Sequence, residues 1–243
     1  MNADGIDPRS ELDLGTAGAS AHAEFLRRRG SDDQRRREMF GKHLAPLIRV
    51  IAGERQSTTA WERGGRGEEM VGTYLSHAVG AIGVLLHDRA IPGRRANIDH
   101  IAVVPSGVWI IDTKQYRGHV QRRERGRWFT SHPALFVNGR DRTDLITSVL
   151  HQMALVERTV GAAAPLHAAL CFNGVEWSWL SRPFTINGVS VTWARRLGRS
   201  LCQPGLLAPT TIVALAGRIA TAFPSYGVTQ TPPTAPGRRR SAR

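Results

Sequence analysis

Residues 107–114 read Gly107-Val-Trp-Ile-Ile-Asp-Thr-Lys114, and the rest of the expected architecture follows from them. The β-branched and aromatic residues in this run predict a buried β-strand. Successive side chains of a strand point to opposite faces, so Asp112 and Lys114 are expected on one face and Ile111 and Thr113 on the other. A carboxylate and an ammonium group therefore stand side by side within an otherwise apolar strand.

Lysine is rare in this chain, because its 33 basic residues are two lysines and thirty-one arginines. Where arginine supplies nearly every generic positive charge, a lysine among strand-forming residues indicates that a compact, point-like ammonium group is needed there. Spacing alone equally allows a second interpretation, in which Asp112 and Lys114 form a purely structural cross-strand ion pair. The choice between the two depends on the residues that meet this pair.

The composition is that of a soluble globular protein, with 243 residues, 41% of them hydrophobic and 22% charged. The two cysteines, Cys171 and Cys202, show no CxxC spacing, so neither a disulfide framework nor a structural zinc site is indicated. The N-terminus lacks the basic start and apolar core of a secretory signal. No apolar stretch reaches the roughly 20 residues of a membrane span. We therefore expect a cytoplasmic protein that does not contact a membrane.

The formal net charge of +13 is the strongest compositional signal of function. A positive surplus attracts polyanions over long distances and binds them with release of counterions, and nucleic acid is the commonest such partner. The alternative is that an arginine-rich proteome makes basic proteins whatever their task. The charge therefore favours a nucleic acid partner without excluding other roles.

Hydrophobic periodicity and turn residues predict a helix, a β-meander, a second helix and a mixed C-terminal part. The expected helices cover residues 59–78, 141–160 or 143–160, 193–201 and 209–223. The expected strands cover residues 82–87, 98–104, 108–115, 119–123, 127–130 and 168–172, with an extended pair at 184–193. This order predicts an α/β fold in which helices flank a central mixed β-sheet and further helices extend it at both ends.

Five segments are expected along the chain. Residues 1–20 are small and acidic without hydrophobic periodicity, and they are expected to be disordered. Residues 21–56 show near-helical spacing of apolar residues among arginines, which predicts a helical extension. Residues 57–175 hold the core of the domain, 176–224 an α/β extension of that core, and 225–243 a flexible basic tail.

Three acidic residues and one lysine follow one another in the order helix, strand, strand: Glu68, Asp99, Asp112 and Lys114. A carboxylate in a buried strand is costly to desolvate unless it meets a cation or hydrogen-bond donors. If the two strands are neighbours, Asp99 and Asp112 converge, their repulsion raises a pKa, and a bound divalent cation relieves it. Oxygen ligands favour Mg²⁺ or Mn²⁺, which are suited to phosphodiester hydrolysis.

Three motifs in this region resemble, in their order, those of the nuclease-related domain (NERD) family. They are Gly64-x-x-Gly67-Glu68, Asn97-Ile-Asp99-His100 and Pro105-Ser-Gly107-Val-Trp-Ile-Ile-Asp112-Thr-Lys114-x-Tyr116-x-Gly118. The likeness covers about residues 64–175. It implies a restriction-endonuclease-like PD-(D/E)xK fold, with residues 57–175 as the nuclease core.

The resemblance also implies roles for individual residues. Asp99 and Asp112 would bind the metal, and the catalytic set would be Glu68, Asp99, Asp112, Lys114 and Gln152. Asp112 stands where family members commonly have glutamate, although the shorter side chain still provides a carboxylate. Gln152 is similar to a glutamine expected on the following helix, but Ser148-Val149-Leu150 replaces the asparagine-proline pair that often precedes it.

These expectations converge on a Mg²⁺-dependent (or Mn²⁺-dependent) nuclease that hydrolyses phosphodiester bonds of DNA by a metal-activated water. Lys114 would offset the charge that develops on the reacting phosphate or orient the nucleophile. Two alternatives stay open from the sequence: a nucleic-acid-binding module that keeps the pocket without turnover, and a protein-interaction domain that uses its helical extensions.

Other residues are candidates for contact with nucleic acid. Four arginines flank a turn in the meander and are expected to contact the phosphate backbone: Arg122, Arg123, Arg125 and Arg127. Most tryptophans are expected in the core, but Trp177 and Trp179 follow a turn and are candidates for stacking on bases. His100 alternates with Asp99, so we expect a buried histidine rather than a metal ligand.

Overall fold

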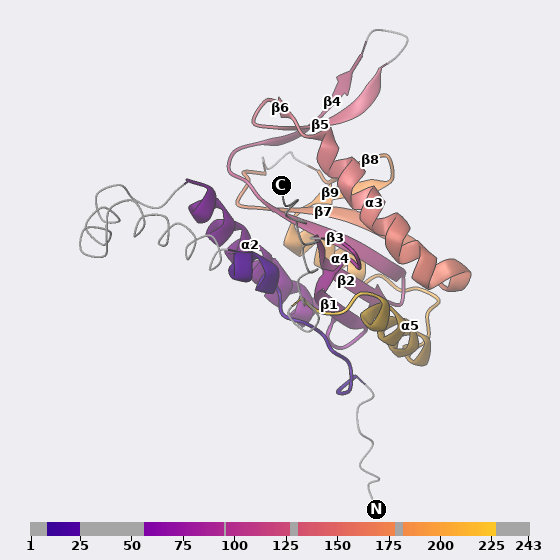
Figure 1. Ribbon diagram of the computed structural model, residues 1–243. Coiled ribbons are helices and arrows are strands. Elements are labelled where there is room, and N and C mark those ends of the chain that lie inside the picture. The colour runs from indigo at the N-terminus through magenta and orange to yellow at the C-terminus, as the bar shows by residue number, and fades with distance from the viewer. Residues whose placement is uncertain (1–8, 25–55, 95, 127–130, 178–181, 227–243) are drawn as a thin grey trace, which may run out of the picture.

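The computed structural model describes residues 9–24, 56–94, 96–126, 131–177 and 182–226 (Figure 1). Its main body has three layers, in which a mixed β-sheet lies between two pairs of helices. The sheet carries the candidate residues, so its strand order decides which of them meet.

The sheet has six strands in the order β1-β2-β3-β7-β9-β8. They are β1 (Val84–Ala90), β2 (Asn97–Val104), β3 (Gly107–Gln115), β7 (Leu166–Asn173), β8 (Phe184–Ile186) and β9 (Val189–Thr192). β1, β2 and β3 form an antiparallel meander, whereas β7 joins β3 and β9 joins β7 in parallel. β8 pairs antiparallel with β9 at the edge. The α/β fold with a central mixed sheet is therefore confirmed.

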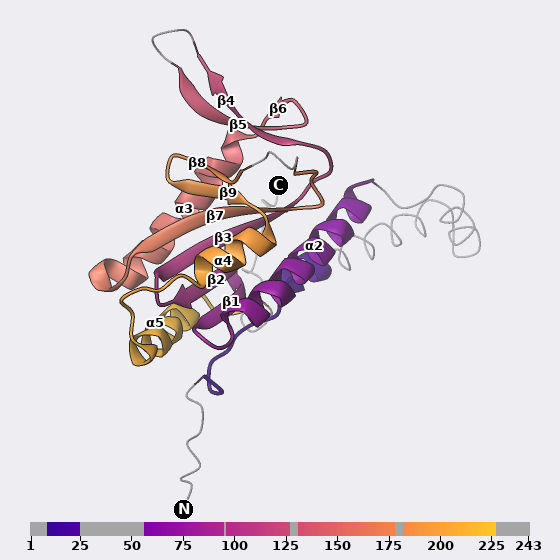
Figure 2. The ribbon, with the colours of Figure 1, turned by 180° about the vertical axis from the view of Figure 1, so that it is seen from behind.

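Helices cover both faces of this sheet (Figure 1, Figure 2). They are α2 (Gln56–Val79), α3 (Thr143–Val160), α4 (Ala194–Leu201) and α5 (Pro209–Ala222). On one face α2 and α4 pack through Val71 and Leu197 into an apolar cluster with Ile111. On the other face α3 and α5 pack with Ile110. Because Ile110 and Ile111 are consecutive in β3, the two-residue period of the strand supplies both layers of the core.

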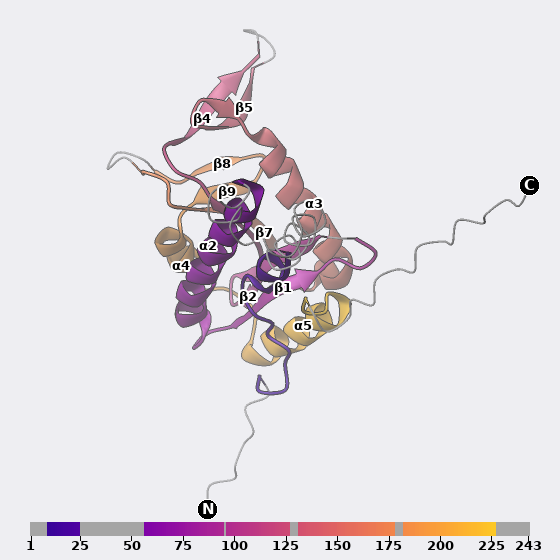
Figure 3. The same ribbon diagram turned by 60° about the vertical axis from the view of Figure 1, so that its left-hand side comes forward.

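A second sheet contains β4 (Val120–Arg125), β5 (His132–Val137) and β6 (Arg140–Asp141). It projects from the main body (Figure 3), and the chain enters it after leaving the carboxyl end of β3. The strand predicted at 127–130 lies outside the described residues. β5 was not predicted, because Pro133 near its start is typical of a loop or an edge strand.

Residues 9–24 lie against β1 and α2, which corrects the disorder predicted for residues 9–20. The carbonyl of Leu14 accepts a hydrogen bond from the backbone N–H of His87 at 2.7 Å. This segment is held by hydrogen bonds and by close packing of small residues rather than by a periodic apolar face. Hydrophobic periodicity therefore gave no signal for it.

The predicted terminal extensions are described only in part. Of the helical extension at 21–56, the structure describes residues 21–24, which are helical, and Gln56, where α2 begins. Of the tail at 225–243, it describes Ser225, which forms a β-bridge with Arg89, and Tyr226. No helix within the described residues combines the length and the apolar character that a bilayer span requires.

Two glycines let α2 approach its neighbours closely. A Cβ atom on Gly67 would lie 2.0 Å from the side-chain oxygen of Gln115, at the end of β3. A Cβ atom on Gly72 would lie 2.6 Å from that of Ala17 in the N-terminal segment. Glu68 stands between these two contact points, so the packing of α2 fixes its place beside the sheet.

Candidate active site

The candidate site lies where β2 and β3 separate. Backbone pairing between the two strands runs from Val104 opposite Gly107 to His100 opposite Ile111. Beyond this point the backbone N–H of Thr113 donates instead to the carboxylate of Asp99, at 2.7 Å. The carboxylate of Asp99 thus replaces a backbone carbonyl of β2 as the acceptor, which places it beside the end of β3.

Asp112 and Lys114 contact each other on one face of β3. The Nζ atom of Lys114 lies 2.6 Å from Oδ2 of Asp112, whose side chain is buried, whereas that of Lys114 is 27% exposed. Burial lowers the pKa of the Lys114 ammonium, but the Asp112 and Asp99 carboxylates outweigh burial and raise this pKa above its usual value. Lys114 is therefore a permanent cation that still reaches solvent.

Asp99 shares this electrostatic environment. Burial and the negative charge of Asp112 raise the pKa of the Asp99 carboxyl group to about 7, against the lowering effects of Lys114 and of the Thr113 N–H. Two carboxylates close together oppose each other's ionisation, and a cation bound between them would remove that opposition. Asp99 therefore titrates near neutral pH.

Glu68 reaches the site from α2. Burial, followed by the charges of Asp99 and Asp88, raises the pKa of its carboxyl group to about 9. A backbone hydrogen bond from Gly18 N–H to Oε1 of Glu68, 3.0 Å long, acts in the opposite direction. Glu68 is therefore protonated at neutral pH, which limits the negative charge around Asp99.

Gln152 reaches the site from α3, on the other side of the sheet. Its Nε2 atom donates a long hydrogen bond of 3.5 Å to Oδ1 of Asp112. Its Oε1 atom is buried and has no hydrogen-bond partner among the described residues. The structure thus brings together all five residues of the predicted catalytic set, from α2, β2, β3 and α3.

Asp88 is a further buried carboxylate that sequence reasoning did not single out. It is fully buried at the end of β1, and its Oδ1 accepts a hydrogen bond of 2.7 Å from Nδ2 of Asn97. Its charge contributes to the raised pKa values of Glu68 and Asp99. The available signal was an acidic residue close to the apolar run at residues 84–86, because a carboxylate next to a buried strand is costly to desolvate.

His100 is fully buried and contacts a second histidine, as its ring atom Nδ1 lies 3.0 Å from Nδ1 of His87. Burial lowers the pKa of His100 to about 3 and that of His87 to about 4. Both rings are therefore neutral at physiological pH. They pack beneath Gly72 of α2, where His100 supports the helix that carries Glu68.

The arginines predicted to contact the phosphate backbone lie exposed on β4, apart from Arg127, which lies outside the described residues. Arg122 forms an ion pair of 2.9 Å with Glu124, and Arg125 one of 2.7 Å with Asp141. Arg123 donates two hydrogen bonds to Gln121 and lies over the ring of Phe136. Acidic neighbours thus already compensate two of these three described arginines.

The oxygen atoms of this site fit a hard divalent cation better than a soft one. Asp99 and Asp112 both offer carboxylate oxygens, and the charge of Asp112 contributes to the raised pKa of Asp99. Gln152 Oε1 is a buried acceptor that finds no donor among the described residues. Within the described part of the chain, no group of three or more His, Cys, Asp or Glu side chains is arranged to hold a metal ion. A cation at this site would therefore have one or two carboxylates, those of Asp99 and Asp112, and Mg²⁺ typically completes such a shell with water and phosphate oxygens.

Comparison with known protein families identified a matching family. The family model described as nuclease-related domain matches residues 63–173, a range that includes all five residues gathered at the site. A search of curated proteins found no match, and a search of solved structures found none either. The mixed sheet flanked by helices agrees with the restriction-endonuclease-like fold expected for this family. Residues 63–173 of this chain are therefore similar to the nuclease-related domain.

Proposed function

We propose that this protein is a Mg²⁺-dependent nuclease that hydrolyses phosphodiester bonds of DNA. The observation that carries the proposal is the 2.6 Å contact between Lys114 and Asp112, next to Asp99, where β2 and β3 separate. The nuclease-related domain supports a task on nucleic acid, and the net charge of +13 supports a polyanionic substrate.

Asp99 and Asp112 are the residues that would hold the cation. A Mg²⁺ ion bound there supplies a Lewis acid for a phosphodiester oxygen and lowers the pKa of a bound water molecule. Asp99 must be ionised to take this role. Because its pKa is about 7 without a cation, binding of the metal should become tighter as the pH rises through neutrality.

The remaining side chains orient the metal-binding carboxylates and control the charge of the site. Lys114 keeps its proton because its pKa is raised, and its positive charge offsets the negative charge that develops on a reacting phosphate. The amide of Gln152 orients the Asp112 carboxylate through the hydrogen bond to Oδ1. Glu68 keeps its proton at neutral pH, so it adds no further negative charge that would repel the phosphate.

A digestion assay tests this function. Purified full-length protein, incubated with linear and with circular DNA and Mg²⁺, should break both down, and EDTA should stop the reaction. Asp112→Ala and Lys114→Ala should each lower the rate by at least about a hundredfold, as expected when a charged group that stabilises the transition state is removed. Asp144→Ala, which removes an exposed carboxylate from α3, is the matched control and should keep full activity.

Other outcomes separate the competing functions. If both site variants keep their activity, the proposed catalytic set is wrong. If the wild-type protein binds DNA with a strong dependence on salt but never cleaves it, the site belongs to a binding module. If it shows no salt-sensitive affinity for DNA, a protein-interaction role for this chain is favoured.

A further inference from the structure

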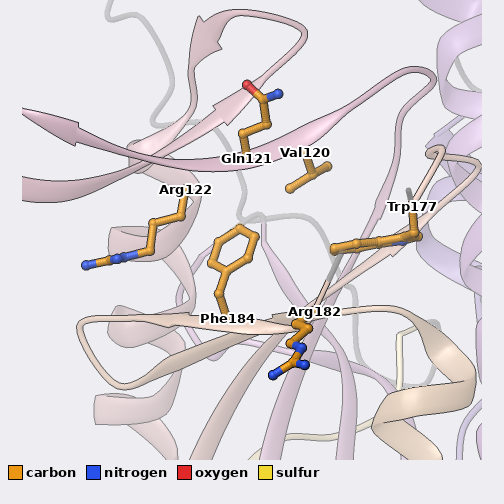
Figure 4. A pocket seen from close by; sticks show the side chains of 6 residues that line it. All are labelled: Val120, Gln121, Arg122, Trp177, Arg182 and Phe184. Carbon is orange, nitrogen blue, oxygen red and sulfur yellow. The ribbon is translucent and has the colours of Figure 1, made fainter. Parts of the chain in front are cut away.

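An open hollow lies between the projecting sheet and the edge of the main sheet (Figure 4). It is lined by Val120, Gln121, Arg122, Trp177, Arg182 and Phe184. The chain reaches Val120 soon after leaving β3 and reaches Trp177 soon after leaving β7. Because β3 and β7 run in parallel, both segments leave the sheet at the same end, which is also the end that carries Lys114.

Aromatic rings form two sides of this hollow. In Figure 4 the ring of Phe184 and the ring of Trp177 lie on either side, with Val120 above. The Trp177 ring packs against that of Trp193 at a tilt of 46°, with 4.8 Å between the ring centroids. Phe184 and Trp177 are only partly buried, so each ring leaves surface for a planar ligand.

The border of the hollow is positively charged. Arg122 and Arg182 are both exposed. Arg122 forms an ion pair with Glu124 at 2.9 Å. No ion-pair partner of Arg182 is found within the described part of the chain. The side chain of Gln121 points away from the hollow in Figure 4, and its amide oxygen accepts hydrogen bonds from Arg123. Flat apolar walls with guanidinium groups at the outer edge of the hollow suit a ligand with a planar base and a phosphate.

We propose that this hollow binds one unpaired nucleotide of the nucleic acid substrate, with its base against Phe184 and Trp177 and its phosphate on Arg182. A base within a duplex is stacked on both faces and cannot enter a hollow lined by rings, whereas an unpaired base can. The substrate class is therefore single-stranded DNA, or duplex DNA with an unpaired end. This inference extends the proposed nuclease function and rests on it for the identity of the polymer.

Binding without turnover tests the inference. Full-length protein in EDTA is titrated with a labelled oligothymidine and with a labelled blunt hairpin duplex, and fluorescence anisotropy gives both affinities. Phe184→Leu removes the ring but keeps an apolar side chain, and Arg182→Ala removes an exposed charge. Phe184→Leu should weaken binding of the oligothymidine about tenfold, the order of magnitude of one stacked base. Arg182→Ala should weaken it about tenfold through the lost phosphate contact, and both variants should leave hairpin binding within about twofold.

Arg199→Ala is the matched control, because it removes an exposed arginine from α4 on another part of the surface. It should leave both affinities within about twofold. Equal weakening of both ligands by Phe184→Leu and Arg182→Ala, or no weakening by either, would overturn the inference. Thymidine monophosphate should bind far more weakly than the oligothymidine, and equal affinity would make the hollow a site for free nucleotides and also overturn it.

The two proposals fail in different ways. If the affinity pattern is found and DNA is never cleaved in the presence of Mg²⁺, the nuclease function is wrong and the nucleotide site stands. If DNA is cleaved through Asp112 and Lys114 while the hollow variants bind like wild type, the nuclease function stands and the hollow has no part in it.

Discussion

The backbone N–H of Gly18 donates a hydrogen bond of 3.0 Å to the carboxyl group of Glu68, fifty positions later in the chain. Ser20 does the same for Asp88. Both donors belong to the N-terminal segment, outside the range matched by the family model. Two of the acidic groups around the site are therefore held by a part of the chain that is not in the nuclease-related domain.

The raised pKa of Glu68 predicts how stability depends on pH. The unfolded chain ionises this residue near pH 4.5, whereas the folded protein keeps its proton up to about pH 9. The unfolded state therefore binds fewer protons in this window, so this residue lowers the free energy of unfolding as the pH rises. Glu68→Gln, which cannot titrate, should gain stability relative to wild type by more than about 1 kcal/mol between pH 5 and pH 8, since one pKa unit is worth about 1.4 kcal/mol.

Urea denaturation of both proteins in EDTA at these two pH values measures the difference. The glutamine side chain keeps an oxygen that can accept from Gly18, so the variant changes the proton and little else. Stability curves that run parallel between pH 5 and pH 8 would show that Glu68 is already ionised in the folded protein.

Binding of Mg²⁺ should stabilise the fold through Asp99 and Asp112. A ligand that binds only the folded state, at ten times its dissociation constant, adds about 1.4 kcal/mol. The resulting rise in Tm should be larger at pH 8 than at pH 6, because Asp99, with a pKa of about 7, must lose its proton to bind the cation. Differential scanning fluorimetry at both pH values measures it without any need for turnover.

Asp112→Asn should abolish the Mg²⁺-dependent rise in Tm, and Asp144→Asn, on the exposed face of α3, should leave it unchanged. An equal rise in all three proteins would indicate an unspecific salt effect and would remove the support for a cation site at Asp112.

Local sequence patterns were enough for most of the fold. Periodicity predicted β3 at residues 108–115 and the structure has it at Gly107–Gln115, and α3 ends at Val160 as expected. The period of a strand also put Asp112 and Lys114 on one face, where they are in contact. Their catalytic roles stay predictions, because an ion pair and a catalytic pair share this geometry.

Contacts made by distant segments were the part that periodicity missed. The strand expected at residues 82–87 ends before Asp88 and Arg89, whereas β1 includes both residues. Both residues are fully buried, since residues 13–20 cover them on one side and the end of α5 on the other. A positive φ of 47° at Asp88 breaks the alternation there. Asp88 and Arg89 are buried only because segments distant in the sequence pack over them.

Two glycines in helices should respond to alanine in opposite ways. A Cβ atom on Gly72 in α2 would lie 2.6 Å from that of Ala17 and 3.1 Å from the ring of His100, so Gly72→Ala should cost about 1–3 kcal/mol. A Cβ atom on Gly217 in α5 meets only Leu12, at 3.6 Å, so Gly217→Ala should gain about 0.5–1 kcal/mol from helix propensity. Chemical denaturation of the two variants measures both changes.

The same pair of variants tests whether the N-terminal segment packs on α2. If Gly72→Ala is as stable as Gly217→Ala, then Ala17 does not occupy the space beside the helix. A proteolysis experiment adds a local readout, because Gly72→Ala should speed cleavage within residues 9–24 and Gly217→Ala should not.

Removal of the buried Arg89 side chain should cause a large loss of stability. Its buried guanidinium group donates to the carbonyls of Phe223 at 2.6 Å, Ala220 at 3.0 Å and Asp13 at 2.9 Å, which ties the end of α5 to the N-terminal segment. Arg89→Met leaves the buried carbonyl of Phe223 and the partly buried carbonyls of Ala220 and Asp13 without this donor, so we expect a loss of about 3–5 kcal/mol in the free energy of unfolding.

Arg89→Lys separates the contribution of the charge from that of the hydrogen-bond geometry. A lysine keeps the charge but lacks the planar guanidinium group that donates to three carbonyls at once. The loss of stability in Arg89→Lys should therefore be at least half of that in Arg89→Met. Arg94→Met, at an exposed position after β1, is the control and should stay within about 0.5 kcal/mol of wild type in urea denaturation. If Arg89→Met is as mild as this control, the carbonyls of α5 and of residue 13 find water instead, and the N-terminal segment is not anchored through Arg89.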